Sequence, residues 1–342
     1  MRLFSLPELW RIVGSRLILS TRYRRIEPDS SLSAFSESAE VFSAPRLFER
    51  KKRLRHGVGS GNGLGADSEI LFFQTVAPRF GNHIVSLITL HHLTQGYPQG
   101  AMVNVLAPKW SRGKSASWRR GAVTVSVGNS IFQGSWPNRV LIHNTYFLPE
   151  SALDFSEAAE AARMDIWRML DIPTRGRDED SAASDVLTIH IRGGDIFAAN
   201  PHPEYTPPPL AFYVEAISSA PWRSIAIVRE DDNPLARALI AWLVAEGLRW
   251  SVNTPDFDQD FALLTSARNL VAGHGTFLPT IAYLSDKIDR VYAFTPELFS
   301  WMRPRSATVI PMTGDWEAYK SLMGEWKAEP WQITLATTWN MG

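Results

Sequence analysis

The residues with the clearest potential for chemistry form the hexapeptide His190-Ile191-Arg192-Gly193-Gly194-Asp195. It directly follows a β-branched and apolar run, residues 186–189, which predicts a strand buried on both faces of a parallel sheet. In open α/β sheets, ligands bind at the carboxyl ends of the strands. An arginine there presents a planar fork of donors that suits a diphosphate. The alternative interpretation is a Gly-Gly turn with a surface pair between Arg192 and Asp195.

Two further loops have residue types that suit the same ligand edge. Glu230-Asp231-Asp232-Asn233-Pro234 combines acidic residues with a proline in the first turn of an expected helix, and Gly273-His274-Gly275-Thr276-Phe277 is a glycine-rich turn before another helix. Backbone N–H groups at a helix N-terminus bind anions. Helix capping alone would explain each loop. Together the three loops predict one pocket for a phosphate-bearing ligand, although neither a Walker A pattern nor a G-x-G-x-x-G turn is present in the sequence.

The elements that must position these loops alternate regularly in the second half of the chain. Strands are expected at 186–191, 224–228, 248–252, 270–272 and 290–294, and helices at 210–218, 234–246, 258–267 and 276–284. Strands that alternate with helices of about ten residues indicate right-handed βαβ crossovers and a parallel sheet.

The first half predicts a second α/β unit, since 342 residues are long for a single core. Its strands are expected at 70–74, 102–106, 122–127 and 139–143, and its helices at 82–93 and 158–170. We therefore predict an α/β protein of two Rossmann-like domains. The predicted divisions are an N-terminal lead at 1–67, an α/β domain at 68–175, a second at 185–310, and a C-terminal helical segment at 311–342 that packs back on the body.

Composition narrows the functional classes. Lysine plus arginine and aspartate plus glutamate number 35 each, so no global field favours nucleic acid. Cysteine is absent, which excludes disulfides and thiolate metal sites and favours a reducing cytoplasm. Neither a signal peptide nor an apolar run of spanning length is recognisable. A basic cluster at 46–55 predicts either a solvated face or peripheral attraction to an anionic membrane.

Three motifs in order carry a resemblance to a known family. Residues 79–83 (RFGNH) are similar to an R-[FL]-G-N-Q element, and 190–195 to an H-x-R-R-x-D element. Residues 260–265, followed by 275–277 and 281–285, are similar to a D-L-x-L-[ML]-S … S-S-[FQ] … A-Y-L-S element. The chain resembles the GDP-fucose-dependent fucosyltransferase superfamily, which includes bacterial α-1,2-, α-1,6- and protein O-fucosyltransferases, over about residues 70–295.

The resemblance implies a role for each matching position. Arg192 would hold the β-phosphate and stabilise charge as GDP leaves, and Asp260 would accept hydrogen bonds from guanine. Thr276 would place its hydroxyl on the diphosphate, Asn82 would reach the donor from the first domain, and Asp195 would lie near the transferred sugar. The other positions implied to line the donor site are His190, for packing or nucleotide positioning, and Gly81, Gly275 and Phe277.

The implied activity is that of an inverting, metal-independent glycosyltransferase with a GT-B-like fold, in which the two domains face across a cleft. It would move fucose from GDP-fucose to a glycan hydroxyl, as in polysaccharide biosynthesis, with 68–175 on the acceptor side and 185–310 holding the nucleotide-sugar. No cofactor is expected, because the D-x-D-like runs 256–260 and 178–180 are read as a helix start and a linker. The alternatives are another GDP-hexose as donor, or a non-catalytic relative that binds nucleotide-sugar or glycan.

Departures from the family pattern fall at three positions. Gly193 stands where the family often has a second arginine, Gly275 where it has serine, and His83 where it has glutamine. A proline-rich segment, 202–209, follows the Arg192 loop. It predicts either an acceptor-facing rim or a rigid loop. The residues that the rim interpretation places on the acceptor side are His202, Glu204 and Tyr205.

Overall fold

The computed structural model describes the second half of the chain almost continuously, at residues 183–203, 205–253, 256–302 and 307–340. In the first half it describes shorter segments, at 40–43, 69–74, 80–82, 84–85, 100–104, 116–120, 123–127, 139–143, 160, 163–164 and 166–167. The basic cluster at 46–55 and the runs 86–99 and 168–182 lie outside the described residues, as do His83 and Glu204.

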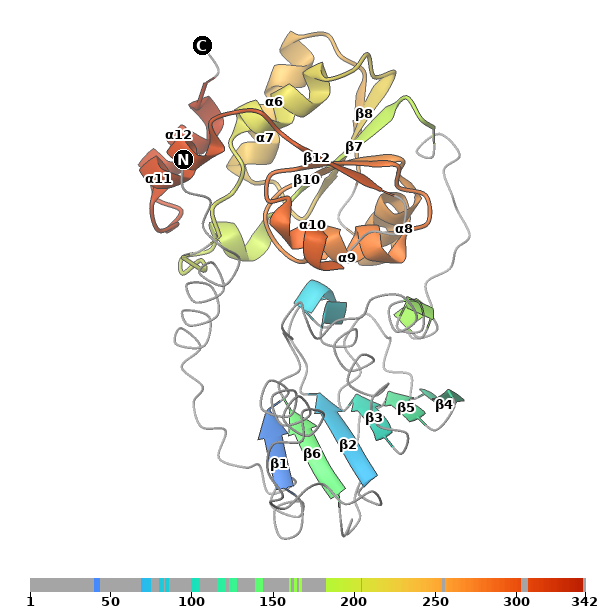
Figure 1. Ribbon diagram of the computed structural model, residues 1–342. Coiled ribbons are helices and arrows are strands. Elements are labelled where there is room, and N and C mark those ends of the chain that lie inside the picture. The colour runs from blue at the N-terminus through green and yellow to red at the C-terminus, as the bar shows by residue number, and fades with distance from the viewer. Residues whose placement is uncertain are drawn as a thin grey trace.

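The second half folds around a six-stranded sheet with the order β12-β11-β10-β7-β8-β9 (Figure 1). Every neighbouring pair is parallel. The strands are β7 (Val186–Ile191), β8 (Ser224–Arg229), β9 (Trp250–Val252), β10 (Asn269–Ala272), β11 (Arg290–Ala293) and β12 (Thr308–Pro311). Counted within this unit, the order is 3-2-1-4-5-6, which is that of a dinucleotide-binding sheet, and the direction of progression reverses between β7 and β10.

Helices connect these strands, as the alternation predicts. They are η3 (Gly194–Phe197), α6 (Leu210–Ser218), α7 (Pro234–Ala245), α8 (Phe257–Ser266), α9 (Phe277–Leu284) and α10 (Glu297–Met302). Two more helices, α11 (Trp316–Met323) and α12 (Pro330–Thr338), follow the last strand. The sequence did not predict β12 or α10. It also began β9 two residues early, because Leu248 donates its N–H to Leu243 O and so closes the end of α7 around Gly247, whose φ is +66°.

The core of this unit surrounds β7, of which all six residues are buried. Leu187, Ile189 and Ile191 pack in one cluster with Phe212 of α6 and Leu239 of α7. This double-sided burial explains the unbroken apolar run in the sequence, and it places the carboxyl end of β7 in the middle of the sheet edge.

The C-terminal helices pack on the same unit and hold the loop that follows η3. Trp326 is fully buried, donating its backbone N–H to Pro203 O at 2.9 Å and its indole N–H to Ile196 O. Tyr319, also fully buried, donates its hydroxyl to Pro207 O at 2.9 Å. The last part of the chain therefore anchors the proline-rich segment 202–209 from behind.

The first half forms a second six-stranded sheet, with the order β1-β6-β2-β3-β5-β4 (Figure 1). Only the β4–β5 pair is antiparallel. The strands are β1 (Glu40–Ser43), β2 (Glu69–Gln74), β3 (Gly100–Asn104), β4 (Ala116–Arg120), β5 (Val123–Val127) and β6 (Arg139–His143). The sequence did not predict β4, nor β1, which comes from the segment that it assigned to the lead. The predicted class, α/β with two units built on mainly parallel sheets, is confirmed.

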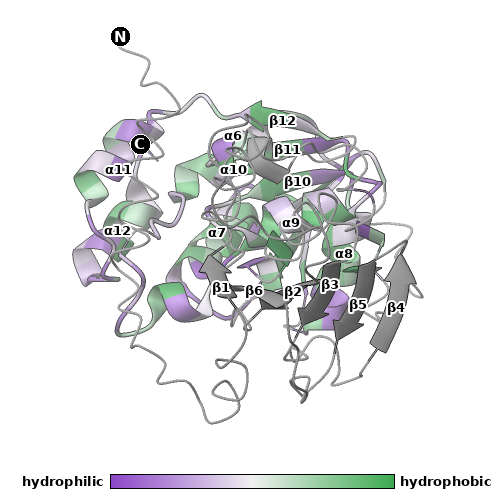
Figure 2. Ribbon diagram, turned by 60° about the horizontal axis from the view of Figure 1, so that its bottom comes forward, coloured by the Kyte–Doolittle hydropathy of each residue, from purple (hydrophilic) through white to green (hydrophobic). Residues whose placement is uncertain are grey.

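Helical residues 80–85 of the first half, where described, reach the second unit at its α8 and α9 side (Figure 1). The helices α8 and α9 are neighbours (Figure 2). Trp167 adds a second contact, since its indole N–H donates to Leu284 O at 3.1 Å. Among the described helices, none has both the length and the apolar character that a bilayer-spanning segment needs.

Candidate active site

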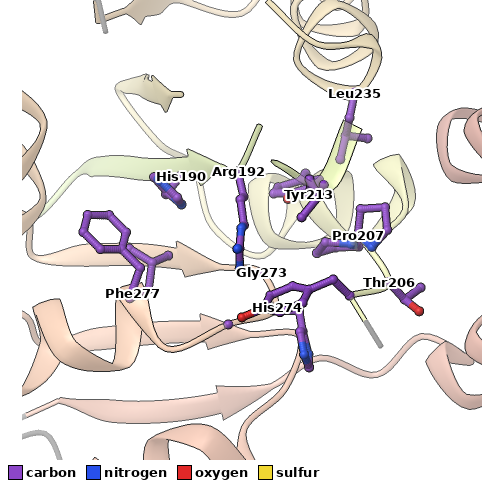
Figure 3. A pocket seen from close by; sticks show the side chains of 14 residues that line it. His190, Arg192, Thr206, Pro207, Tyr213, Leu235, Gly273, His274 and Phe277 are labelled. Atoms are coloured by element: carbon purple, nitrogen blue, oxygen red, sulfur yellow. The ribbon is translucent and has the colours of Figure 1, made fainter. Parts of the chain in front are cut away.

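A pocket opens where the sheet order of the second unit reverses. Arg192 follows β7, and Gly273-His274-Gly275 follows its neighbour β10, so both loops meet at the carboxyl edge. His190, Tyr205 and Phe277 also line the pocket. Figure 3 shows the Arg192 side chain extended between Phe277 and His190 on one side and Tyr213 on the other. The predicted loops after β7 and β10 therefore do come together at this pocket, whereas residues 230–234, the third predicted loop, do not line it.

The Arg192 guanidinium is held on several sides. Its Nη2 forms an ion pair with Asp195 Oδ2 at 3.0 Å, and its Cζ lies 4.0 Å from the centre of the Tyr205 ring. Only 15% of the side chain is exposed. Burial on its own would lower the pKa of Arg192, but Tyr205, Asp195 and Glu230 together raise the pKa above its ordinary value. The pocket thus contains a fixed positive charge with a defined orientation.

Gly275 shapes the opposite wall of the pocket. Its φ is +123°, a conformation that side chains disfavour, and a Cβ at this position would lie 2.8 Å from Nη1 of Arg192. The same Cβ would lie 3.3 Å from the Tyr205 ring. Glycine at position 275 therefore has a local reason, because the backbone here lies directly against the arginine.

His190 is positioned for packing. Burial, together with the charge of Arg192, lowers its pKa to about 3, so the ring is neutral at physiological pH. The ring centre lies 5.1 Å from that of Phe277. A neutral ring in this contact can support a bound nucleotide but is a poor proton carrier near neutral pH.

The N-terminus of α9 receives two residues from the first half of the chain. Thr276 makes no capping hydrogen bond to its own helix and donates its hydroxyl to Asn82 Oδ1 at 2.7 Å. Gly81 is buried there too, and a Cβ on it would lie 2.7 Å from Thr276 Oγ1 and 2.8 Å from Phe277 N. The structure therefore brings Gly81, Asn82 and Thr276 together at the N-terminus of α9, and helix N-termini favour negatively charged ligands.

An aromatic cluster supports this junction, and sequence reasoning missed it. The Phe80 ring lies 5.3 Å from Phe257, 5.5 Å from Phe261 and 5.9 Å from Phe277, measured between ring centres. Phe80 is 8% exposed, so it is buried between α8 and α9. The sequence signal that could have indicated its role is its place directly before Gly81 and Asn82, which were expected at the donor site. The ring fixes where these two residues meet the second unit.

Asp260 occupies a different corner, in the first turn of α8. Asn253, which follows β9, donates its side-chain N–H to Asp260 Oδ1. Burial raises the pKa of Asp260 to about 6, against the opposing effect of the Asn253 hydrogen bond. Asp260 does not line the pocket around Arg192. A ligand that contacts both must be extended, as a nucleoside diphosphate is.

The segment 202–209 is a loop that is held from one side and lines the pocket from the other, and its contact with an acceptor stays a prediction. Tyr205 covers Arg192 and also contacts His202 and His274, with ring centres 5.6 and 5.0 Å away. The hydrogen bonds to Trp326 and Tyr319 hold the backbone of the same segment. It is a supported loop that presents Tyr205 to the pocket. Glu204 lies outside the described residues.

His274 is a pocket residue whose role the sequence did not indicate. Its Nδ1 lies 3.0 Å from Thr295 Oγ1. Burial, with Lys320, Arg192 and His202, lowers its pKa to about 4. A neutral histidine next to Tyr205 adds a polar group to the wall without adding charge. Its place between two glycines in the sequence was a weak signal.

Among the described residues there is no cluster of three or more histidine or carboxylate side chains suited to a metal ion. Asp256 instead accepts a hydrogen bond from Gln259 N at 3.0 Å and so caps α8. The run 178–180 lies outside the described residues.

Comparison with known proteins finds remote structural likeness only. No protein-family model matches the sequence, and no curated protein matches it. The fold is similar to that of POFUT1 in a complex with GDP, with a TM-score of 0.38 and 10% identity over 72% of this chain and 99% of that one. It is similar to Escherichia coli heptosyltransferase WaaC with ADP, with a TM-score of 0.37 and 14% identity over 71% and 93%. The ADP-heptose heptosyltransferase II of the same organism gives 0.35 and 14% over 72% and 92%. At these scores the likeness assigns no role to any residue.

Proposed function

We propose that this chain is a glycosyltransferase that uses a nucleoside-diphosphate sugar, with GDP-fucose as the donor and a glycan hydroxyl as the acceptor. The observation that carries the proposal is Arg192, a fixed cation at the point where the sheet order reverses. It lies beside Gly275, one residue before Thr276 and the N-terminus of α9. A cation and a helix N-terminus next to each other suit two linked phosphates.

The chemistry follows from this arrangement. The acceptor oxygen attacks the anomeric carbon, the bond from that carbon to the β-phosphate oxygen breaks, and the diphosphate leaves with the bonding electrons. The acceptor hydroxyl loses its proton to water as the new bond forms. Arg192 and the α9 N-terminus would stabilise the charge that grows on the leaving group, because they are oriented before reaction and largely shielded from water. An oxocarbenium-like transition state lessens the need for a strong general base.

The guanine preference rests on Asp260. Its carboxylate, oriented by Asn253, can accept from the ring N–H and the exocyclic amine of guanine. Uracil and adenine do not present this pair of donors. Gly81 and Asn82 reach the N-terminus of α9 from the first half of the chain. They would hold the donor from the side on which we place the acceptor.

The test is nucleotide selectivity. GDP should raise the melting temperature of the protein more than UDP, ADP or CMP at equal concentration, because ligands stabilise the folded state by RT ln(1 + [L]/Kd). Asp260→Asn should remove the preference for GDP and leave the fold intact. In the wild-type protein, turnover of GDP-fucose should exceed that of GDP-mannose. A larger shift with UDP would contradict the donor assignment.

A further inference from the structure

The turns that follow the neighbouring strands β7 and β8 are joined by hydrogen bonds. Gly193 N–H donates to Glu230 Oε2 at 3.2 Å, and Gly194 N–H donates to Asp231 Oδ2 at 2.7 Å. Glu230 N–H also donates to Ile191 O at 3.3 Å. The chain's own carboxylates therefore occupy the two glycine amides next to Arg192.

Asn233 fixes the Asp231 carboxylate. Its side-chain N–H donates to Asp231 Oδ1 at 2.9 Å and reaches Arg192 O at 3.4 Å. Its oxygen accepts from Ala236 N at 3.0 Å, which caps α7. Asn233 is only 3% exposed. The N-terminus of α7 is thus linked through Asn233 to the backbone of Arg192, and through Asn233 and Asp231 to the amide of Gly194.

This link leaves no room for a side chain at position 193. A Cβ there would overlap with the carboxylate of Asp231. Gly194 has a φ of +55°, in the left-handed region that glycine favours. The backbone conformation of the turn at 193–194 therefore depends on glycine at both positions, and the lack of a side chain at Gly193 leaves the space that the Asp231 carboxylate fills.

We infer that Asp231, held by Asn233, is a positioning residue for Arg192, and that Gly193 is glycine because Asp231 lies against it. The inference deepens the proposed function, on which its catalytic part rests. The phosphates would be bound by the Arg192 side chain and the α9 end, and not by the Gly193 and Gly194 amides. Position 193, where the resembled pattern often has a second arginine, is then glycine because the Asp231 carboxylate leaves no space for a side chain, and Arg192 alone supplies the positive charge of this turn.

The first experiment needs no ligand. Phenylglyoxal modification of Arg192 is followed by peptide mass mapping in the wild type, Asp231→Ala and Asp231→Asn. The matched control is Asp232→Ala, which removes the next carboxylate, 59% exposed and paired with Arg229 and Arg237. Arg192 should react roughly threefold to tenfold faster in Asp231→Ala, because the turn that carries it loses one hydrogen bond of ordinary strength and opens more often. Asp231→Asn, which keeps an acceptor oxygen, should show a smaller increase, and Asp232→Ala none.

The second experiment measures the dissociation constant of GDP for the wild type, Asp231→Ala, Arg192→Ala and the double variant. If Asp231 acts through Arg192, the double variant binds GDP no more weakly than Arg192→Ala alone. Additive losses would overturn the inference. So would equal modification rates of Arg192 in Asp231→Ala and the wild type. Failure of the wild type to bind GDP would instead contradict the proposed function, and the modification rates would still decide whether Asp231 positions Arg192.

Discussion

Gly193 and Gly81 are both packed too closely to accept a side chain, but Gly193 contacts side-chain atoms and Gly81 contacts mainly backbone atoms. Gly193 lies against the carboxylate of Asp231, a side chain. Gly81 lies against Thr276 C and Phe277 N, which are backbone atoms of the α9 end, as well as Thr276 Oγ1. A side chain can be shortened by a second substitution, whereas backbone cannot. The contact at Gly193 should therefore be repairable, and the contact at Gly81 should not.

The largest effect is expected at Gly81. Gly81→Ala should lower turnover about a hundredfold, because a shift of about 1 Å at the junction misplaces Asn82 relative to the donor. Adding Thr276→Ala should not restore activity, since two backbone atoms still lie 2.8 Å from the new Cβ. Steady-state kinetics of both variants beside Thr276→Ala alone provide the measurement. Recovery in the double variant would show that the hydroxyl was the whole obstacle.

The next effect concerns Gly193 and sharpens the contrast. Gly193→Ala should lower the free energy of unfolding by about 1–3 kcal/mol, the usual cost of overpacking. In an Asp231→Ala background the same change should cost much less, with a coupling of about 1 kcal/mol or more. Denaturant unfolding of the four proteins in the cycle measures it. Independent, additive losses would mean that the two residues do not compete for space.

These two regions also differ in how far the sequence predicts them. The unbroken apolar run of β7 and the hexapeptide after it place Arg192 at the ligand edge, because strand burial and turn chemistry are local properties. The α6 bounds and the α7 start follow in the same way from apolar spacing and from Pro234. The residues next to Arg192 in the sequence are thus enough to predict that it follows directly after a buried strand.

The ion pair between Arg192 and Asp195 is local, and the sequence suggests it. The other contacts that hold the arginine come from distant parts of the chain, and the sequence does not reveal them. Tyr205 packs over Arg192, and Trp326 supports the Tyr205 loop from more than a hundred residues further along. Phe80 packs between helices of the other unit. Each is an aromatic residue whose type fits any core equally well, so only the folded chain shows which surface it meets.

A pH effect should come from Asp260 and not from the glycine turns. With a pKa of about 6, the carboxylate is protonated in acid and loses its ability to accept from guanine. GDP affinity should fall about tenfold from pH 7 to pH 5. The sign for stability is opposite, because the raised pKa stabilises the fold at low pH and this contribution is lost as pH rises through 6. Titration calorimetry across this range measures the affinity, and Asp260→Asn should give a flat profile.

The smallest expected effect is that of metal removal. Because Arg192 supplies positive charge at the site and the described carboxylates form no metal cluster, EDTA should leave turnover unchanged. Loss of activity with chelator and its return with Mg²⁺ or Mn²⁺ would assign the leaving-group charge to a metal instead of the arginine.

The central claim is that Arg192 stabilises a departing nucleoside diphosphate. The direct measurement is kcat and KM for GDP-fucose with the wild type, Arg192→Lys and Arg192→Ala, each checked for an unchanged fold. Arg192→Ala should lower kcat about a hundredfold or more, with a smaller change in KM, because the interaction strengthens as charge develops. Arg192→Lys should lose at least about tenfold, since an ammonium cannot bridge two oxygens as the fork does. Full turnover by a folded Arg192→Ala protein would contradict the account and leave the hexapeptide as a structural turn.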